Sequence, residues 1–488
     1  MSLDTFHWSD SWTYLFNIFY IISVFFTILV IIFEDQNAIK TVSWVLVVLL
    51  LPVLGIIIYL HFGRNFRKEK LFSRKGLVDF MKLEKLSKNQ IKSLSLNQEF
   101  EESEAKDKAN IVKLLINNSK ALLTNRNHVR VLNNGKTTFD AIIAALESAK
   151  HHIHLEYYIY DMDKIGTRIA DILKRKAKEG VEVRFIYDAV GSWHLKRKDI
   201  RDLESAGVQT QCFMKVKLPH LTHRINYRNH RKIVVVDGQT GFVGGINVAD
   251  KYIEGDPELG FWRDTHLEIQ GDSVQSLQAV FLTDWFFLSN EIVQDASYFP
   301  KHHIEEKKWL QITASGPDSD WSSIMQAYFT AITSAKHSIY ISTPYFVPNE
   351  SILTALRTAA LSGVEVILLI PGKSDVSIQL WSTYSFLSSL MYAGVKVYIY
   401  EKGINHGKIM MVDGNFSSVG TANMDVRSFD KNFEVNALIY DRETTQDLEE
   451  SFMQDLEGST LLDLESFKER PFMVKMREQM ARLLSPLF

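Results

Sequence analysis

Two long apolar runs stand near the start of the chain. Residues 12–33 and residues 41–62 are each 22 consecutive uncharged, mostly apolar positions, and a short polar loop with Glu34, Asp35 and Lys40 separates them. A helix needs about 20 apolar residues to cross the hydrocarbon core of a bilayer. Each run therefore predicts a transmembrane helix, and together they predict a membrane hairpin. The alternative, two buried helices of a soluble domain, fits less well because both runs are apolar on every side of the helix.

Basic residues follow the second run and predict the orientation of the hairpin. The cluster comprises Arg64, Arg67, Lys68, Lys70, Arg74 and Lys75. Cytoplasmic flanks of membrane helices are enriched in Lys and Arg, so the pattern places this cluster and the chain after it on the cytoplasmic side. We therefore expect a multi-pass protein of the cell membrane. Its membrane anchor covers residues 1–75, and a juxtamembrane connector covers residues 76–125.

The rest of the chain alternates between predicted helices and strands, and it does so twice. Residues 141–160 match residues 327–346, and both segments contain the tetrad Ser-Ala-Lys-His. In each copy helical periodicity leads into the tetrad, a strand follows it, and a further helix and strand come next. This order predicts an α/β fold of two halves, each with a partly parallel sheet. We place the first half at residues 126–300 and the second at residues 301–488.

One motif occurs in both halves with identical spacing. It reads His-x-Lys-x4-Asp-Gly, starts at His230 and again at His406, and continues with a Gly seven residues after the Asp and an Asn three residues further. The apolar run after each Lys predicts a buried strand, and positions i and i+2 of a strand share a face. The His and the Lys of each copy therefore project together. The motif residues are His230, Lys232, Asp237, Asn247, His406, Lys408, Asp413 and Asn423.

These residue types suit the transfer of a phosphoryl group. Two Lys ammonium groups and two Asn amides, at Asn247 and Asn423, can bind the non-bridging oxygens of a phosphate. One His can attack phosphorus and form a phosphohistidine, while the other protonates the leaving oxygen. Because His titrates near neutral pH, this chemistry needs no metal and no cofactor. Two structural hairpins with surface His and Lys residues are the alternative, which the duplication disfavours.

The Asp residues complete the catalytic motif, but their position differs from that of the other members. Asp237 and Asp413 each precede a Gly and leave the strand on a predicted turn. We expect them to be structural partners of the motif backbone or of the Lys, rather than contacts to phosphate.

The repeated motif resembles that of the phospholipase D superfamily, and the resemblance covers most of the chain after the hairpin. Further segments are similar to the cardiolipin synthase branch of that superfamily, namely 155–159 (LEYYI), 225–232 (INYRNHRK), 342–348 (STPYFVP) and 482–487 (RLLSPL). The resemblance implies one active site shared between two pseudo-twofold related halves. It also implies a bacterial membrane enzyme that transfers a phosphatidyl group between two phosphatidylglycerol molecules and yields cardiolipin and glycerol. On the same ground we expect His230 to be the nucleophile and His406 the general acid and base.

A carboxylate follows each motif at the start of a predicted strand. The first is Asp264, in Trp-Arg-Asp, and the second is Glu434, in Asn-Phe-Glu. A carboxylate that accepts a hydrogen bond from a His fixes its tautomer and raises its basicity. We expect Asp264 to orient His230 and Glu434 to orient His406. Ordinary charges at the edge of a strand are the alternative.

A basic and apolar stretch lies just before the first motif. Its basic residues are Lys215, Lys217, His220, His223, Arg224, Arg228 and Arg231. Such a mixture suits the head group of an anionic lipid, although a solvated charged loop has the same composition.

Composition limits the other functions. The chain carries 55 Lys and Arg against 58 Asp and Glu, a net charge of −3, which argues against a nuclease because nucleic-acid enzymes usually carry a basic surface. One cysteine, Cys212, allows no intrachain disulfide. A phospholipase D hydrolase would use the same residues with water as acceptor, and a non-catalytic membrane scaffold would need neither motif. The sequence specifies neither the acceptor, which could be phosphatidylglycerol, phosphatidylethanolamine, glycerol or water, nor the oligomeric state.

Overall fold

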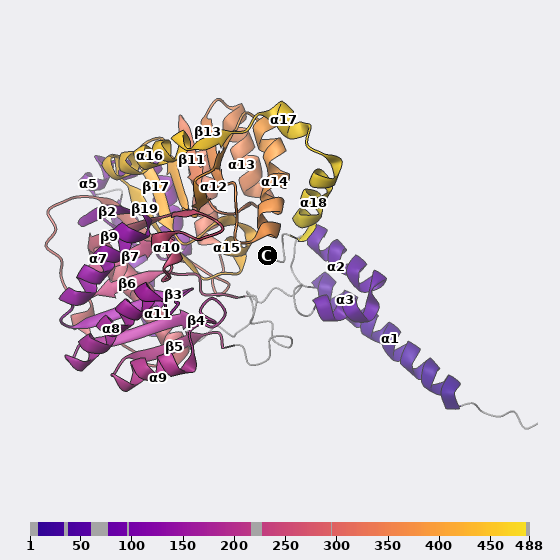
Figure 1. Ribbon diagram of the computed structural model, residues 1–488, viewed down its shortest axis with the longest axis horizontal. Helices are drawn as coiled ribbons and strands as arrows, with labels where there is room; N and C mark the ends of the chain where they lie inside the picture. The colour runs from indigo at the N-terminus through magenta and orange to yellow at the C-terminus, as the bar shows by residue number, and fades with distance from the viewer. Residues whose placement is uncertain are drawn as a thin grey trace, which may run out of the picture. The chain divides into compact units, whose positions relative to one another are not determined.

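A computed structural model describes residues 8–33, 38–59, 77–94, 97–215, 227–293 and 295–484. The predicted basic cluster at residues 64–75 lies outside these residues, as do residues 217–224 of the second basic stretch. Figure 1 shows the helices and strands with their labels. The N-terminal helices form one compact unit and the α/β body forms another.

Within its described residues the N-terminal unit forms the helices α1 (Trp8–Phe33), α2 (Ala38–Leu50) and α3 (Pro52–Ile58). They pack around the buried side chains of Ile31, Val48 and Tyr59. The predicted single run over 41–62 is broken between α2 and α3, because Pro52 has no N–H to donate and takes the first position of a new helix. Among the described residues, no helix combines the length and the apolar composition that crossing a bilayer requires.

The first half of the body is built on a seven-stranded mixed sheet with the order β2-β9-β7-β6-β3-β4-β5. Strands β3, β4 and β5 pair in parallel, and the other neighbours pair antiparallel. The elements are β2 (Asn127–Asn133), α7 (Asn134–Ser148), β3 (His152–Tyr157), α8 (Lys164–Lys178), β4 (Glu182–Asp188), α9 (Arg197–Ser205), β5 (Gln209–Phe213), β6 (Ile233–Val236), β7 (Thr240–Gly244), α10 (Lys251–Glu254), β8 (Phe261–Arg263), β9 (Thr265–Gly271), α11 (Asp272–Ser289) and the 3-10 helix η6 (Ala296–Tyr298).

The second half repeats this sheet within a nine-stranded one, β1-β10-β19-β17-β16-β11-β13-β14-β20. Its strands β11, β13 and β14 are parallel, as β3, β4 and β5 are in the first half. The elements are β10 (Trp309–Ser315), α12 (Ser323–Thr333), β11 (Ser338–Ser342), β12 (Phe346–Val347), α13 (Glu350–Leu361), β13 (Glu365–Pro371), α14 (Ser377–Tyr392), β14 (Lys396–Tyr400), β15 (Gly403–Asn405), β16 (Ile409–Val412), β17 (Phe416–Gly420), β18 (Met424–Asp425), α15 (Val426–Asp430), β19 (Glu434–Tyr440), α16 (Arg442–Glu457), β20 (Ser459–Leu461), α17 (Leu464–Lys468) and α18 (Phe472–Leu484). The predicted duplication of an α/β half is confirmed.

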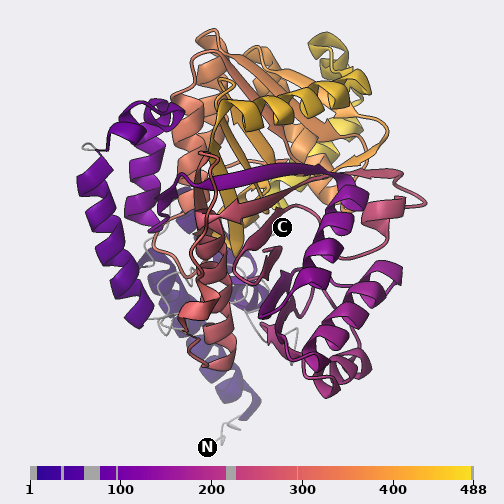
Figure 2. The same ribbon diagram turned by 90° about the vertical axis from the view of Figure 1, so that its left-hand side faces the viewer.

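The two sheets pack against each other, and the motif strands lie at this contact (Figures 1 and 2). Ile233 and Val235 of β6 share one apolar cluster with Ile409 and Met411 of β16. The alternate residues of β6 face the helices of the first half instead. The motif strand is thus buried on both faces, which explains why its sequence is a continuous apolar run rather than an alternating one.

The segment before the first half belongs structurally to the second. Its elements are α4 (Leu77–Leu94), α5 (Gln98–Glu101), the 3-10 helix η4 (Glu104–Lys108), α6 (Ala109–Asn118) and β1 (Leu123–Thr124). Strand β1 pairs with β10, and Val112 and Leu115 of α6 are buried in the core of the second half. Figure 2 shows these purple helices along the side of the orange half.

Candidate active site

His230 is held by a carboxylate that comes from the opposite half. Its Nδ1 lies 3.0 Å from Oε2 of Glu434, at the start of β19. The Thr421 hydroxyl donates to the same Glu434 oxygen at 2.5 Å, and the amide of Asn432 donates to the other at 3.2 Å. Glu434 is fully buried and His230 is nearly so. Because Nδ1 of His230 is engaged by the carboxylate, Nε2 is the nitrogen available for chemistry.

His406 has the matching arrangement in the other direction. Its Nδ1 lies 2.7 Å from Oδ2 of Asp264, which precedes β9 of the first half. The backbone N–H of Thr265 donates to the other Asp264 oxygen at 2.8 Å. A Cβ on Gly245 would lie 2.2 Å from that carboxylate. Gly245 and Thr421 are equivalent positions, because each follows its motif His at the same distance. Asp264 thus occupies the space beside Gly245 that a side chain at this position, such as that of Thr421, would need.

The predicted pairing of each His with the carboxylate of its own half is therefore wrong, and the pairs are crossed. The cause lies in the chain just before each motif. Strand β15 runs into His406 and pairs in parallel with β8 of the first half, so that the His406 N–H donates to the Arg263 carbonyl at 2.7 Å. The His230 N–H likewise donates to the Phe433 carbonyl at 2.9 Å. Each His thus lies beside the backbone that leads into the opposite carboxylate.

Both motif lysines are buried and lie beside the histidines. Lys232 donates to the His230 carbonyl at 2.7 Å and Lys408 to the His406 carbonyl at 2.6 Å. Nζ of Lys408 also lies 2.9 Å from Nδ1 of His406. The ring of Tyr158 lies close to both His230 and Lys232, with its centroid 5.0 Å from the imidazole and 5.5 Å from the ammonium.

Burial in this shared site lowers the pKa of both motif histidines and both motif lysines. Burial lowers the pKa of His230 to about 4, with Glu434 opposing the shift. Burial and then the Lys408 charge lower the pKa of His406 well below 6.5. Burial also lowers the pKa of Lys232 to about 7 and that of Lys408 to about 8. Each His also interacts electrostatically with the Lys of the opposite motif, so the two motifs form one site.

The pKa values of the two orienting carboxylates, Asp264 and Glu434, shift in opposite directions. Burial raises the pKa of Asp264. Burial acts on Glu434 as well, but the charge and hydrogen bond of His230, with Lys232 and Thr421, hold the pKa of Glu434 below its ordinary value. The carboxylate behind His230 is therefore the more firmly ionised of the two.

Both motif Asn residues are buried, and the side chain of Asn247 has partners other than the motif His and Lys residues. Asn247 accepts a hydrogen bond from the Ile159 N–H at 3.1 Å and donates to the Tyr252 hydroxyl at 2.8 Å. Asn423 is buried, and its backbone N–H donates to the Ser428 hydroxyl at 3.2 Å. These bonds fix the loops that follow β7 and β17, and phosphate binding by Asn247 and Asn423 stays a prediction.

Asp237 and Asp413 lie at the far end of the motif strands and bind backbone instead of joining the His residues. The Asp237 carboxylate accepts from three consecutive N–H groups, those of Lys150, His151 and His152, at 2.8 to 2.9 Å. Asp413 does the same for residues 336–338 of the second half. The two repeated tetrads are thus the partners of the two motif Asp residues. Asp237 and Asp413 thus bind backbone from their turns and are not brought together with the motif His and Lys residues. Their partners are the segments before β3 and β11 instead of the predicted motif backbone or motif Lys.

Replacing Asp237 by Ala should destabilise the fold and leave the chemistry intact. The change leaves three backbone N–H groups without their acceptor, which costs roughly 2–4 kcal/mol of unfolding free energy. Asp413→Ala should cost at least as much, because it also breaks a buried 2.7 Å ion pair with Lys108. Denaturant unfolding measures the loss, and turnover per folded molecule should stay within about threefold. Normal stability with lost turnover would place these carboxylates in the reaction instead.

Sequence reasoning missed a buried charged layer beneath His230. Asn229 donates to the Glu156 carboxylate and Arg231 pairs with Asp284, all of them buried. Arg231 also donates to the Glu434 carbonyl at 3.2 Å, so this layer supports the carboxylate that orients His230. The sequence feature that could have indicated this layer is the Asn directly before each motif His. In the second half Asn405 accepts from the Ser342 hydroxyl at 2.9 Å and no charge is involved in that contact.

Two described residues of the second basic stretch, Arg228 and Arg231, are buried inside the body. Arg228 is 2% exposed and pairs with Asp188 at 3.2 Å, while Arg231 is 3% exposed and pairs with Asp284. For these two residues the prediction of a head-group contact is wrong. Their charges are used inside the protein, because a buried guanidinium needs a carboxylate partner.

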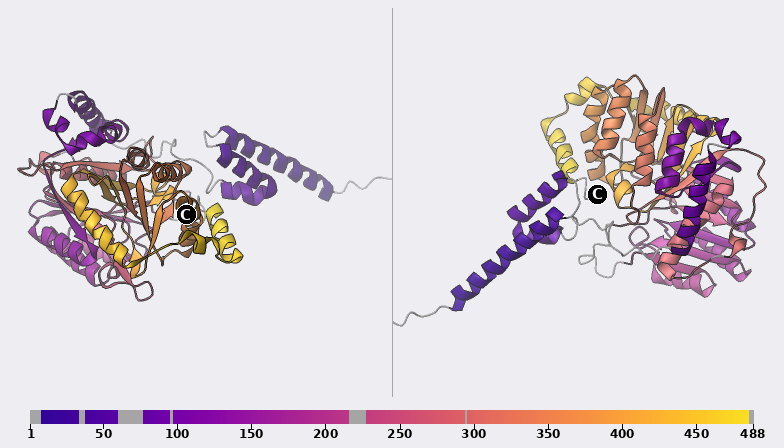
Figure 3. Two further views of the ribbon diagram at one scale, coloured as in Figure 1. Left: turned by 90° about the horizontal axis from the view of Figure 1, so that it is seen from above. Right: turned by 180° about the vertical axis from the view of Figure 1, so that it is seen from behind.

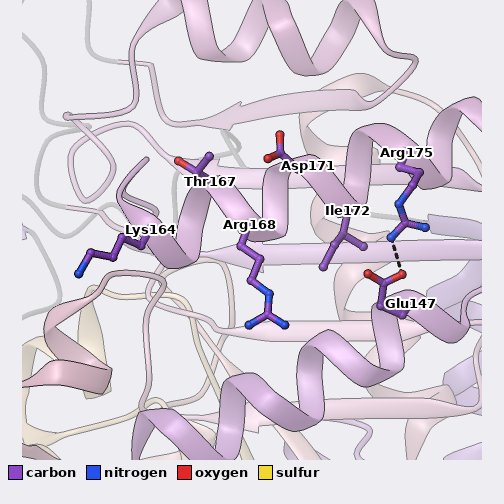
Figure 4. Close-up of a pocket in the computed structure, with 7 residues that line it drawn as sticks. All are labelled: Glu147, Lys164, Thr167, Arg168, Asp171, Ile172 and Arg175. Carbon is purple, nitrogen blue, oxygen red and sulfur yellow. Dashed lines mark hydrogen bonds and ion pairs between the residues drawn. The ribbon is translucent and has the colours of Figure 1, made fainter.

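A pocket on the outside of the first half, between α7 and α8, contains none of the motif residues (Figure 4). Its lining residues are Glu147, Lys164, Thr167, Arg168, Asp171, Ile172 and Arg175. Arg175 pairs with Glu147 across it and with Glu179 at 3.2 Å. We assign this pocket no function.

The duplicated sheets and the crossed His and carboxylate pairs define a two-motif protein of the phospholipase D type. A family model described as cardiolipin synthase, PLD-like domain, matches residues 142–285 and 328–456. A second model, described as phospholipase D-nuclease N-terminal, matches residues 18–64. The chain belongs to the cardiolipin synthase family of the phospholipase D superfamily.

Similar proteins agree with this assignment. The cardiolipin synthase of Geobacillus sp. (strain WCH70) is 44% identical over 95% of this chain and 92% of its own length. The major cardiolipin synthase of Bacillus subtilis (strain 168) is 42% identical over 97% of this chain and 98% of its own. Among solved structures, the phosphatidylserine synthase of Haemophilus influenzae Rd KW20 has the same fold, with a TM-score of 0.58 at 14% identity, covering 79% of this chain and 100% of that one.

Proposed function

We propose that this protein is a cardiolipin synthase that moves a phosphatidyl group from one phosphatidylglycerol to another through a phosphatidyl-histidine. The observation that carries the proposal is the pair of crossed contacts, in which each imidazole is held through Nδ1 by a buried carboxylate and lies beside a buried Lys. The relatives that are named cardiolipin synthases, similar over nearly the whole chain, support the choice of substrate class.

In the first step, Nε2 of His230 attacks the phosphorus of phosphatidylglycerol, and the bond from phosphorus to the glycerol oxygen breaks. His406 gives its proton to that oxygen, and glycerol leaves. In the second step, neutral His406 takes the proton from a hydroxyl of another phosphatidylglycerol. The resulting oxygen attacks phosphorus, the bond from phosphorus to Nε2 breaks, and cardiolipin forms. Lys232 and Lys408 neutralise the non-bridging oxygens in both steps.

The assignment of His230 as nucleophile has support in the electrostatics of the two carboxylates. An ionised carboxylate at Nδ1 strengthens Nε2 as a nucleophile. The pKa of Glu434, behind His230, is held low, whereas the pKa of Asp264, behind His406, is raised.

We also propose that the N-terminal segment is a two-span anchor and that the body works at the cytoplasmic surface. The supporting observations are the two apolar runs and the family match over residues 18–64. In addition, the basic residues after the second run favour a cytoplasmic body.

The test is a product assay with the full chain in phosphatidylglycerol vesicles and no added divalent metal. Cardiolipin and glycerol in equal amounts are the expected products. Phosphatidic acid with glycerol would identify a hydrolase, because water would then be the acceptor. No turnover of any lipid would overturn the proposal.

The pH dependence of kcat/KM should have two unusual limbs. His230 must be neutral to attack, and its pKa of about 4 keeps it neutral as pH falls past 6.5. Lys232 and Lys408 must be charged to bind phosphate, and they lose their protons as pH rises through about 7 and 8. His406 must carry a proton in the first step, and its lowered pKa makes that form scarcer as pH rises. Activity should therefore persist below pH 6.5, decline as pH rises from there, and fall further above about 7, where Lys232 begins to lose its charge. Lys232→Arg should move the alkaline limb upward, since guanidinium stays charged, while Lys178→Arg on the exposed surface of α8 should not. An acid limb at 6.5 with no alkaline fall would contradict this account.

A further inference from the structure

The last helix, α18, presents an apolar face to the outside of the body. Five large side chains lie on that face, and their exposed fractions are 75% for Phe472, 65% for Met473, 42% for Met476, 56% for Met480 and 74% for Leu483. In a helix these positions fall within one arc of about 120°. Figure 3 shows α18 in yellow at the outer edge of the second half, against α14.

The opposite side of α18 fixes the helix to the body. Ala481 is 2% exposed and Glu478 is 4% exposed, and Glu478 pairs with Arg470 at 2.6 Å. Two cations lie over aromatic rings of α14, with Arg477 4.4 Å from the Trp381 ring and Arg482 4.6 Å from the Phe386 ring. The exposed apolar face is thus the outward side of a docked helix.

The charges of α18 favour an anionic lipid surface as the occupant of this face. Lys475 and Arg482 flank the apolar arc on one side and Arg477 flanks it on the other. The one acidic residue of the helix, Glu478, is turned inward and neutralised by Arg470. An apolar face between basic flanks is the pattern of helices that lie in the interface of a membrane with anionic head groups. A second copy of α18 would bring the same basic flanks together, which like charges oppose.

We propose that α18 lies in the interface of the anionic membrane that carries the substrate, with Phe472, Met476 and Leu483 inserted among the acyl chains. The inference rests on the proposed function, because it takes the lipid substrate to be in that membrane. It gives the body its own contact with the bilayer, in addition to the N-terminal segment. Unbranched Met side chains adapt to a fluid partner, which suits this role.

The experiment uses the full chain with its single cysteine removed by Cys212→Ser. Met476→Cys, labelled with an environment-sensitive fluorophore, is placed in vesicles of phosphatidylglycerol and phosphatidylcholine that contain a lipid-borne quencher. We expect at least a twofold loss of fluorescence at position 476 and less than a tenth at Glu179→Cys, an exposed site at the end of α8. Absence of quenching at 476 would overturn the proposal, as would cross-linking of two copies through that cysteine.

A double variant separates this inference from the proposed function. Met476→Glu with Met480→Glu should lower turnover of vesicle phosphatidylglycerol about tenfold and leave turnover of a dispersed short-chain phosphatidylglycerol within twofold. Equal losses on both substrates would overturn the membrane contact, since folding or chemistry would then be affected. If the wild type turns over neither substrate, the proposed function fails, while the quenching experiment still decides where α18 lies.

Discussion

Replacing His406 by Ala should trap a phosphatidyl group on His230. With phosphatidylglycerol, His406→Ala and His230→Ala should each lower transfer by roughly 10⁴-fold, because one loses the acid and the other the nucleophile. A phosphatidyl ester of p-nitrophenol separates the two roles, since p-nitrophenolate leaves without a proton. His406→Ala should then release about one equivalent in a burst and stop, because no base activates the second alcohol. His230→Ala should show no burst.

The trapped group is located by mass spectrometry of peptides kept at neutral or alkaline pH, where phosphohistidine survives. The adduct should lie on the peptide that carries His230. A burst in His230→Ala with an adduct on His406 would exchange the two roles. Bursts in neither variant would argue against a covalent intermediate. His337→Ala, a surface His of the second-half tetrad, is the matched control and should turn over normally.

The architecture was predictable because the sequence contains an internal repeat. Two copies of one motif and one tetrad at constant spacing require two copies of one structural unit, and the seven shared strands follow the same order in both halves. The motif His and Lys residues were predictable as a group as well, because both copies place them directly before an apolar run, which forms the buried strands β6 and β16.

The crossed carboxylates could not be predicted in this way. Distance along the chain favours Asp264 for His230 and Glu434 for His406, and the exchange depends on β15 pairing with β8 between the halves. A three-residue strand between two halves leaves no periodic pattern in the sequence. The buried layer of Glu156, Arg231 and Asp284 was hidden for a related reason, since its members come from three separate elements.

In the N-terminal segment, the prediction of one continuous helix over residues 41–62 was wrong. The pattern of uncharged residues over 41–62 gives no weight to Pro52, which ends one helix and starts the next. Composition over a window therefore predicted one continuous helix where the backbone chemistry of a single residue divides it.

Glu434→Gln should reproduce the loss of His230, and Asp264→Asn should reproduce the loss of His406. Each change keeps the shape of the side chain but removes the charge that holds the imidazole N–H and stabilises its protonated form. Comparable changes cost about 10²- to 10⁴-fold in other His and carboxylate pairs. Because the pairs are crossed, Glu434→Gln should abolish the p-nitrophenolate burst. Asp264→Asn should retain the burst and slow the second step.

The two variants therefore distinguish crossed pairs from pairs within each half by which half-reaction fails, whatever the size of the loss. Pairing within each half requires the reverse, a missing burst in Asp264→Asn. Glu268→Gln is the control, because Glu268 belongs to the same strand as Thr265 but pairs with Arg130. Its rates should stay within about twofold of the wild type. If both carboxylate variants lose the burst equally, each His depends on both carboxylates, and the separate roles derived from the 2.7 and 3.0 Å contacts would not hold.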